Sequence, residues 1–371
     1  MIPPSQRLSA SDPELAGRLA QIPNRLGVYV LTPETGNPYV GWSGYLSKRL
    51  SRLLLGSREE DSNRLAKLRS KLAAIEYWLT GSRLETSLLV YWLARKHDSA
   101  RYRQRLKLKS PWLVELLIRD AFPRLSVQNR YITGQGSAFG PFVTREAAER
   151  FQQGAESLFQ LRRCTERLEP HPDHPGCIYG EMNQCMRPCQ LAVTTSEYAA
   201  EVDRVKAFLE SNGRHMLSVL TAARDRASDE TGFEEAARIH REIERVKAVI
   251  GLRDELVTDV ECLNGTALTR GAVDRSIALW PMIAGYWQPP LTIDFSRPDA
   301  DSRSLDRELR EQLGLHLSSP NRDGDRLEHI ALLSRWYYSS WCDGAWFAFN
   351  DLAHLNYRAL VRGISTLLRE T

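Results

Sequence analysis

Two short apolar runs near the start of the chain, separated by a turn-rich stretch, predict a β-hairpin. The runs are Gly27-Val28-Tyr29 and Tyr39-Val40-Gly41, and the residues between them include Pro33, Gly36, Asn37 and Pro38. Gly, Pro and Asn between two apolar segments are typical of a turn between strands. The hairpin would bring Tyr29 and Tyr39 side by side. Tyrosine is common in strands, so this pattern alone also fits an ordinary amphipathic hairpin.

The apolar periodicity of the first third predicts a small α+β domain over residues 20–110. Helices are expected near 44–55 and 60–73, a strand at 74–79 and an apolar-periodic helix at 84–96. Arg49 lies ten residues after Tyr39, on the first of these helices. A guanidinium beside two phenols is compatible with phosphodiester chemistry.

The rest of the chain divides into three further regions. Residues 111–195 have an apolar segment at 112–118, a helix from Thr144 to Leu161 with Thr144 as N-cap, and an irregular segment at 164–189. Residues 196–255 are strongly helical. Residues 256–371 predict a C-terminal α+β domain of unknown role, with strands over 263–287 and helices at 303–315 and 327–341. Its many aromatic side chains are interpreted as core.

Composition indicates a soluble protein of two or three domains. The 371 residues are 42% hydrophobic and 26% charged, and no apolar run reaches the length of a membrane span. The N-terminus lacks a basic start followed by an apolar core, so no secretory signal is expected. We therefore expect a cytoplasmic protein without a membrane partner.

The net charge of +4 hides a strong asymmetry. Residues 1–130 contain 22 Lys and Arg against 11 Asp and Glu, whereas residues 131–371 contain 28 against 35. A basic region of this kind is the expected footprint of a phosphate-backbone binder. A solvated helix face followed by a basic loop is the alternative. The candidate nucleic-acid-binding residues are Arg95, Lys96, Arg101, Arg103, Arg105, Lys107 and Lys109.

Four of the six cysteines lie within 26 residues and predict a metal site. They are Cys164, Cys177, Cys185 and Cys189. In a protein of the reducing cytoplasm such a set favours metal over disulfides. Thiolates suit zinc and iron–sulfur iron alike, His171 and His174 allow a mixed zinc site, and absence of metal stays an alternative. The isolated Cys262 and Cys342 are interpreted as core thiols.

Residues 214–250 predict a helical hairpin. Its second helix has an apolar stripe at helical spacing, and its first helix has a partner stripe that includes Met216 and Leu220. The simplest interpretation is a helix pair in a bundle. The candidate partner-binding residues on the second helix are Phe233, Ala236, Ala237, Ile239 and Ile243.

These features together resemble the UvrC family, the incision component of excinuclease ABC, over residues 20–255. The tyrosine hairpin resembles the GIY-YIG nuclease domain, and Phe139-Gly140-Pro141-Phe142 resembles a signature that follows it. The spacing Cys177…Cys185-Met-Arg-Pro-Cys189 resembles the family's four-cysteine segment, which implies a [4Fe–4S] cluster, with zinc as the alternative. The string from Gly232 to Ile243 resembles the UVR motif, which implies binding to the helicase component UvrB.

The resemblance implies a one-metal phosphodiester hydrolysis with an incomplete site. Tyr39 would act as general base, Tyr29 would hydrogen-bond it, and Arg49 would stabilise the transition state. The family's metal-binding glutamate falls at Val90, and the lysine after the second motif falls at Trp42. Five residues before Val90, Glu85 would point about 140° away on a helix.

The sequence therefore predicts a short UvrC-like protein of nucleotide excision repair. It would bind DNA and a UvrB-like helicase and have impaired or absent endonuclease activity, because valine cannot bind a cation. One alternative is an active endonuclease that uses Mg²⁺ or Mn²⁺ with a relocated ligand. Another is an adaptor whose UVR hairpin and cysteine site serve regulation and do not act on DNA.

Overall fold

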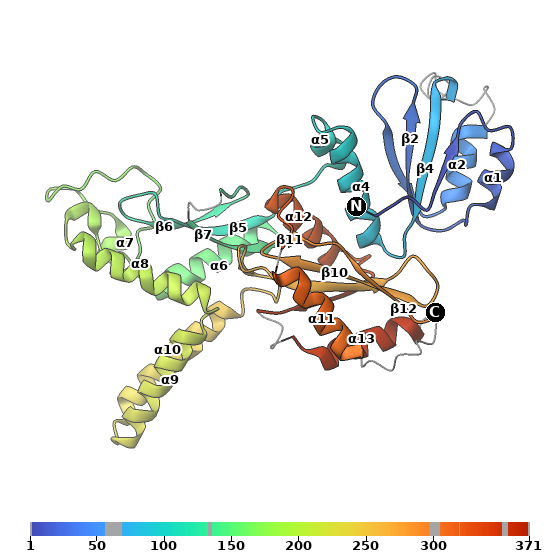
Figure 1. Ribbon diagram of the computed structural model, residues 1–371. Helices are drawn as coiled ribbons and strands as arrows, with labels where there is room; N and C mark the ends of the chain where they lie inside the picture. Colours follow the sequence, from blue (N-terminus) through green and yellow to red (C-terminus); the bar gives the residue numbers. More distant parts are fainter. Residues whose placement is uncertain are drawn as a thin grey trace.

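The computed structural model is an α+β protein built around three antiparallel sheets. It describes residues 2–55, 69–132, 136–296, 305–318, 320–350 and 355–369. Figure 1 shows the N-terminal sheet and the C-terminal sheet close together and a helical hairpin projecting from the middle region.

The N-terminal domain is a four-stranded sheet in the order β1-β4-β2-β3 with helices on its faces. The sheet and its helices extend before residue 20, because β1 pairs with β4. Most of the helix expected at 60–73 lies outside the described residues. The elements are β1 (Gln6–Ser9), α1 (Leu15–Gln21), β2 (Gly27–Pro33), β3 (Tyr39–Ser43), α2 (Leu46–Leu55), β4 (Leu72–Leu79), α4 (Arg83–His97) and α5 (Tyr102–Leu106).

The expected tyrosine hairpin is formed by β2 and β3. Tyr29 pairs with Gly41 and Leu31 with Tyr39, so both tyrosines lie on the same face of the sheet. β2 also pairs with β4 on its other side, which makes it an inner strand. Its residues from Gly27 to Leu31 are accordingly buried.

The middle region, residues 111–195, expected as a linker with a cysteine cluster, contains a sheet in the order β6-β5-β7-β8. α6 covers this sheet and begins at the predicted cap, where the Thr144 hydroxyl accepts from the Ala147 N–H at 3.1 Å. The last strand comes from beyond residue 255. The elements are β5 (Trp112–Leu117), β6 (Arg124–Gln128), β7 (Gly136–Phe142), α6 (Arg145–Leu158) and β8 (Thr258–Asp259).

The cysteine segment is irregular, as expected, and is followed by three helices. It contains α7 (Ile178–Glu181) and the short 3-10 helix η1 (Pro188–Gln190). α8 (Thr195–Glu210) starts with a capping box between Thr194 and Glu197. The predicted hairpin is formed by α9 (Arg214–Asp229) and α10 (Phe233–Ile250), which project away from the body of the molecule in Figure 1.

The C-terminal domain is a sheet in the order β11-β10-β9-β13, with β12 also paired to β10. The helix expected at 327–341 ends earlier than predicted, at Tyr337. The elements are β9 (Gly265–Arg270), β10 (Ser276–Ile283), β11 (Tyr286–Trp287), β12 (Leu291–Asp294), α11 (Leu305–Ser318), α12 (Arg326–Tyr337), β13 (Gly344–Ala348) and α13 (Tyr357–Arg369).

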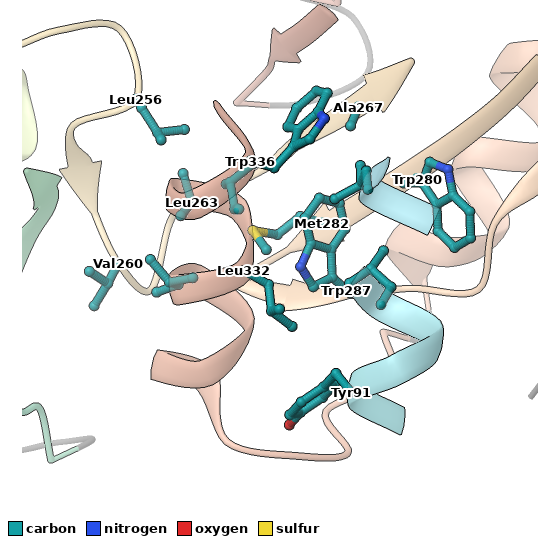
Figure 2. Close-up of a cluster of buried hydrophobic side chains, with 14 of the residues drawn as sticks. Tyr91, Leu256, Val260, Leu263, Ala267, Trp280, Met282, Trp287, Leu332 and Trp336 are labelled. Atoms are coloured by element: carbon teal, nitrogen blue, oxygen red, sulfur yellow. The ribbon is translucent and has the colours of Figure 1, made fainter. Parts of the chain in front are cut away.

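One hydrophobic core joins the N-terminal and C-terminal domains. α4 packs against α12, and Leu88 and Tyr91 of α4 share a buried cluster with Trp280, Trp287 and Trp336. Figure 2 shows Tyr91 on its helix beside the strands and the helix of the C-terminal domain. Trp336 is thus a core residue, as predicted for the tail aromatics. Trp341, which was also interpreted as core, is only half-buried and lines the site described below. The shared core holds α4 and α12 in fixed positions, and both helices line the site described below.

Two expectations about single features have definite outcomes. Cys262 and Cys342 are exposed, so their interpretation as core thiols was wrong. Each lies a few residues after the end of a strand or helix, in an irregular segment. Such a segment has no apolar periodicity that would indicate whether a side chain is buried or exposed. Among the helices that the structure describes, none is long and apolar enough to cross a membrane.

Candidate nucleic-acid interface and nuclease-like site

The tyrosine hairpin and the next helix bring the three predicted catalytic residues together. The Tyr29 and Tyr39 rings lie 6.3 Å apart between centroids. Arg49 on α2 donates from Nε to the Tyr29 hydroxyl at 3.5 Å. Tyr29 is buried, and this burial raises the pKa of its hydroxyl, although the hydrogen bond from Arg49 opposes the shift. The proton of Tyr29 is therefore held, and Tyr39 is the more accessible phenol.

Gly41 is required for this arrangement. It pairs with Tyr29 across the hairpin, and a Cβ at position 41 would lie 2.6 Å from Cζ and from the hydroxyl oxygen of Tyr29. Any larger residue would push the Tyr29 ring away from Arg49. The glycine thus has a local steric function in the site.

The three residues open onto a cavity of about 1070 Å³ where the three domains meet. We call it the cationic cavity. Tyr338 fixes its floor to the middle region, because its hydroxyl donates to Asp254 at 2.7 Å and to the Pro141 carbonyl at 3.1 Å. The residues that line it include Tyr29, Tyr39, Trp42, Arg49, Arg83, Val90, Arg105, Lys107, Lys109, Trp112, Arg335 and Trp341.

The charges on the cavity wall are all positive. Six Lys and Arg side chains line it, and none of its described lining residues is Asp or Glu. Within the described part of the chain, only Arg105 of the six has a carboxylate within 4 Å, at 3.6 Å from Asp98. Clustered like charges repel one another unless an anion joins them. The wall therefore suits a ligand with several negative charges. The six cations are Arg49, Arg83, Arg105, Lys107, Lys109 and Arg335.

Val90, at the expected position of the metal-binding glutamate, lines this cavity. Glu85 does not line it. Glu85 is buried at the start of α4, where its carboxylate accepts from the Gly81 N–H at 2.8 Å. Burial raises the pKa of Glu85 to about 7. The described residues thus offer no carboxylate to a cation beside Tyr39.

The predicted basic run separates into groups with different surroundings. Arg105, Lys107 and Lys109 line the cavity, and the Arg105 guanidinium lies 5.5 Å from the centre of the Tyr39 ring. Arg95 and Arg103 instead contact the C-terminal domain. Lys96 and Arg101 are exposed and are not lining residues of the cavity.

A buried carboxylate, Glu328 on α12, receives three side chains from the N-terminal domain. Tyr91 donates to it at 2.9 Å, Tyr102 at 2.9 Å and the Arg103 Nε at 2.5 Å. We call these four residues the Glu328 cluster. Beside it, Arg95 pairs with Asp323 at 3.1 Å and Arg103 with Asp325 at 3.0 Å. These contacts fix the two domains on either side of the cavity.

The four cysteines are close enough to interact electrostatically. Burial raises the pKa of Cys185, and the sulfurs of Cys177, Cys164 and Cys189 raise it further. The Arg187 N–H donates to the Cys185 sulfur at 3.4 Å. Across the described residues, no three His, Cys, Asp or Glu side chains converge closely enough to hold a single ion.

The first cysteine is held by a buried arginine. Arg162 pairs with Asp120 at 2.7 Å, donates to the Phe122 carbonyl at 2.7 Å and contacts the Cys164 sulfur at 3.8 Å. Its own backbone N–H donates to the Tyr198 hydroxyl at 2.9 Å. The segment is therefore attached to the middle sheet and to α8.

The predicted partner-binding residues occupy two sides of α10. Ile239 and Ile243 are buried, Ala236 is half-buried, Ala237 is exposed and Phe233 is 68% exposed at the start of the helix. α10 packs along α9. Ile239 and Ile243 thus serve the hairpin itself, and Phe233 and Ala237 are the members accessible to a partner.

Four cavity residues were not identified from the sequence. Arg335 and Trp341 belong to a domain more than 200 residues away in sequence, and Trp112 begins a strand of the middle region. No local pattern separates them from other surface or core residues. The fourth, Arg83, stands in the same helix as Val90, and its charge at the helix start was a usable signal.

Comparison with known proteins identifies a family similarity in the middle of the chain. Residues 113–208 match the family model described as UvrC/Cho excinuclease, middle domain. The UvrABC system protein C of Anaeromyxobacter sp. (strain Fw109-5) is 28% identical over 300 residues, which are 79% of this chain and 42% of the relative. That of Desulfatibacillum aliphaticivorans is 27% identical over 329 residues, 87% of this chain and 54% of the relative. The chain spans about half the length of the curated relatives it matches. No solved structure matches.

Proposed function

Because the chain belongs to the UvrC excinuclease family, we propose that it acts in nucleotide excision repair as a DNA-binding protein with an impaired nuclease site. Its N-terminal domain would be a GIY-YIG-like fold that holds the DNA backbone in the cationic cavity. The α9–α10 hairpin would serve as a UVR motif that binds a UvrB-like helicase. Hydrolysis of the backbone would be slow or absent.

A single observation carries this proposal: Tyr29, Tyr39 and Arg49 converge on a cavity whose described lining has six cations and no carboxylate. Phosphates of DNA are the multiply charged ligand that such a wall suits. Cleavage also needs a divalent ion to neutralise charge that develops on the phosphate. Val90 cannot hold that ion, and Glu85 is buried away from the cavity.

A nicking assay tests the proposal. Purified protein would be incubated with UvrB-loaded DNA that carries a lesion, with Mg²⁺ or Mn²⁺. We expect DNA binding without nicking above the level of a Tyr39→Phe variant. Val90→Glu would place a carboxylate on the cavity wall and is expected to raise metal-dependent nicking, and this gain should disappear in Val90→Glu/Tyr39→Phe.

An active endonuclease is the second candidate, favoured by the intact contact between Arg49 and Tyr29. Metal-dependent nicking by the unmodified protein that Tyr39→Phe removes would establish it and refute the impaired site. Failure to bind any DNA would refute the DNA-binding function and favour the adaptor alternative.

The proposed UvrB contact is supported by the position of the hairpin. α9 and α10 project from the body (Figure 1). Phe233, the first residue of α10 after the turn between the two helices, is exposed. We expect Phe233→Ala to weaken binding to a UvrB-like helicase and to leave the folded hairpin intact. Val219→Ala, at a second exposed apolar position, is the matched control. Equal binding by both variants and the unmodified protein would argue against this contact.

We further propose a [4Fe–4S] cluster at Cys164, Cys177, Cys185 and Cys189. Four thiols supply the ligand set, and burial and the neighbouring sulfurs of Cys164 and Cys177 raise the pKa of Cys185 and Cys189. An N–H group directed at a sulfur, as from Arg187 to Cys185, is a means by which proteins tune such clusters. When bound, the cluster would supply structural support to the segment. Anaerobic purification should give a brown protein with charge-transfer absorbance. A colourless protein that contains one zinc ion per chain would refute the iron–sulfur cluster and establish a zinc site.

A further inference from the structure

We propose that the C-terminal domain completes the cationic cavity as a site for an unpaired DNA strand, with Arg335 and Trp341 as its contributions. The inference rests on the proposed binding of DNA in this cavity and adds which form of DNA it takes. It also gives a role to the domain for which the sequence predicted none.

The cavity is not a property of the nuclease-like domain alone. The end of α12 and the residues after it provide Ser334, Arg335, Tyr338 and Trp341 to the same wall as Tyr39 and Arg49. The position of this segment is fixed by Glu328 on one side and by the hydrogen bonds of Tyr338 on the other. A ligand that reaches the tyrosines therefore also meets the C-terminal domain.

The charge of the cavity wall indicates an anionic ligand. The side-chain nitrogens of Arg335 and Arg83 have no carboxylate within 4 Å in the described part of the chain, and neither do those of Lys107 and Lys109. Arg95 and Arg103, which face the C-terminal domain outside the cavity, are by contrast paired. Unpaired cations around one cavity indicate several anionic groups in a row, as in a sugar-phosphate backbone.

Aromatic side chains lie among these cations in the cavity lining. Trp42 is 47% exposed, and the Arg83 guanidinium lies 5.3 Å from the centre of its ring. Trp112 and Trp341 are half-buried on the same wall. Tryptophan rings that alternate with Arg and Lys along a groove are the pattern of single-strand binding, in which bases stack on the rings and phosphates meet the cations.

An unpaired strand fits this wall better than a duplex does. In a duplex the base faces are covered by neighbouring bases, so the tryptophan rings would contact only backbone. A volume of about 1070 Å³ slightly exceeds the roughly 300–1,000 Å³ of small-molecule clefts and cavities. That space suits a few nucleotides whose bases turn toward Trp42, Trp112 or Trp341.

The test is a pair of binding isotherms on the full-length chain. A labelled oligothymidylate and a duplex of equal length would be titrated by fluorescence anisotropy with Trp341→Leu, Arg335→Ala and Arg362→Ala. Arg362 is an exposed arginine of the same domain outside the cavity and is the matched control. Circular dichroism checks that each variant is folded, and the exposed Arg335 keeps the test open if Trp341→Leu does not fold.

We expect Trp341→Leu to weaken single-strand binding by about 5- to 150-fold, the loss of one stacked base, and duplex binding by less than twofold. Arg335→Ala should lower the single-strand salt slope by about 0.7, and Arg362→Ala should change nothing. Unchanged single-strand binding in folded Trp341→Leu and Arg335→Ala would overturn the inference and leave DNA binding intact. A chain that binds neither DNA would overturn the proposed function itself.

Discussion

Two parts of one basic segment have the same charge and opposite surroundings. Arg95 and Arg103 face the C-terminal domain, where they pair with Asp323, Asp325 and Glu328. A few residues later, Lys107 and Lys109 line the cavity and have no described carboxylate within 4 Å. Arg95 and Arg103 are neutralised by carboxylates of the C-terminal domain, and Lys107 and Lys109 are available to a ligand.

This difference shows that charge density along a sequence does not locate a binding surface. The same guanidinium stabilises an interface when acidic residues of another domain meet it, and binds phosphate when none do. The following predictions separate these two uses, beginning with the largest expected effect.

Removal of the acceptor in the Glu328 cluster should have the largest effect. Glu328→Ala leaves the hydroxyls of Tyr91 and Tyr102 without their acceptor, and buried polar groups without a partner are costly. We expect the free energy of unfolding to fall by about 3 kcal/mol. Urea denaturation followed by tryptophan fluorescence measures it.

Glu311→Ala is the control for this measurement, because its ion pair with Arg307 at 3.0 Å lies on the surface. Its effect should stay below about 0.5 kcal/mol. If the free energy of unfolding falls by the same small amount in both variants, the Glu328 cluster does not hold the two domains together.

Acid should weaken the same interface through His329, a buried residue of α12. Its Nδ1 accepts from the Trp287 N–H at 2.9 Å, and Nε2 is buried without a described partner. Burial, with Arg95 nearby, lowers the pKa of His329 to about 4, although Asp325 and Asp323 oppose the shift. The Tyr91 and Tyr286 rings also face it.

Because the folded-state pKa is below that of the unfolded chain, near 6.5, the stability is complete above about pH 6.5 and is lost as the pH falls toward 4. We expect His329 to account for roughly 2–3 kcal/mol of this loss. Denaturation at pH 7 and pH 4.5 should therefore differ less in His329→Gln than in the unmodified protein. The exposed His240→Gln should keep the original difference, and an unchanged His329→Gln would refute the assignment.

Substitutions in the second part of the basic segment, Lys107 and Lys109, should have the smallest effect on the free energy of unfolding and the largest effect on DNA binding. Lys107→Ala/Lys109→Ala should leave unfolding unchanged and lower the salt slope of single-strand binding by about 1.4. Arg95→Ala/Arg103→Ala should lower the free energy of unfolding by about 1 kcal/mol and leave the salt slope of single-strand binding unchanged. Identical salt slopes of single-strand binding in the two double variants would show that the two parts of the basic segment do not differ in DNA binding.

Much of the fold was predictable because local patterns encode it. The turn residues and apolar alternation located the β2–β3 hairpin, and the helical stripe located α9 and α10. The expected N-cap at Thr144 is present. β1 was not predicted, because four residues of mixed polarity have no periodic signal and depend on pairing with β4. The middle sheet was also missed, since its last strand is contributed from beyond the helices.

The candidate site was predictable where its residues are close in sequence. Tyr29, Tyr39 and Arg49 lie on three consecutive elements, so their spacing was sufficient to expect them together. Val90 could be placed at the ligand position by the same family spacing. The proposed metal at the cysteines and the UvrB contact stay predictions.

The sequence by itself determined the tyrosine hairpin, the arginine beside it and the valine on the next helix, because these depend on short-range spacing and side-chain chemistry. Only the tertiary structure decided which cations remain unpaired and which wall closes the cavity. Those outcomes depend on Asp323, Glu328 and Arg335, which are more than 200 residues away and reach the site only when α4 and α12 share one core. Long-range packing therefore places the first part of the basic segment, Arg95 and Arg103, at the domain interface and the second part, Lys107 and Lys109, on the wall of the cavity.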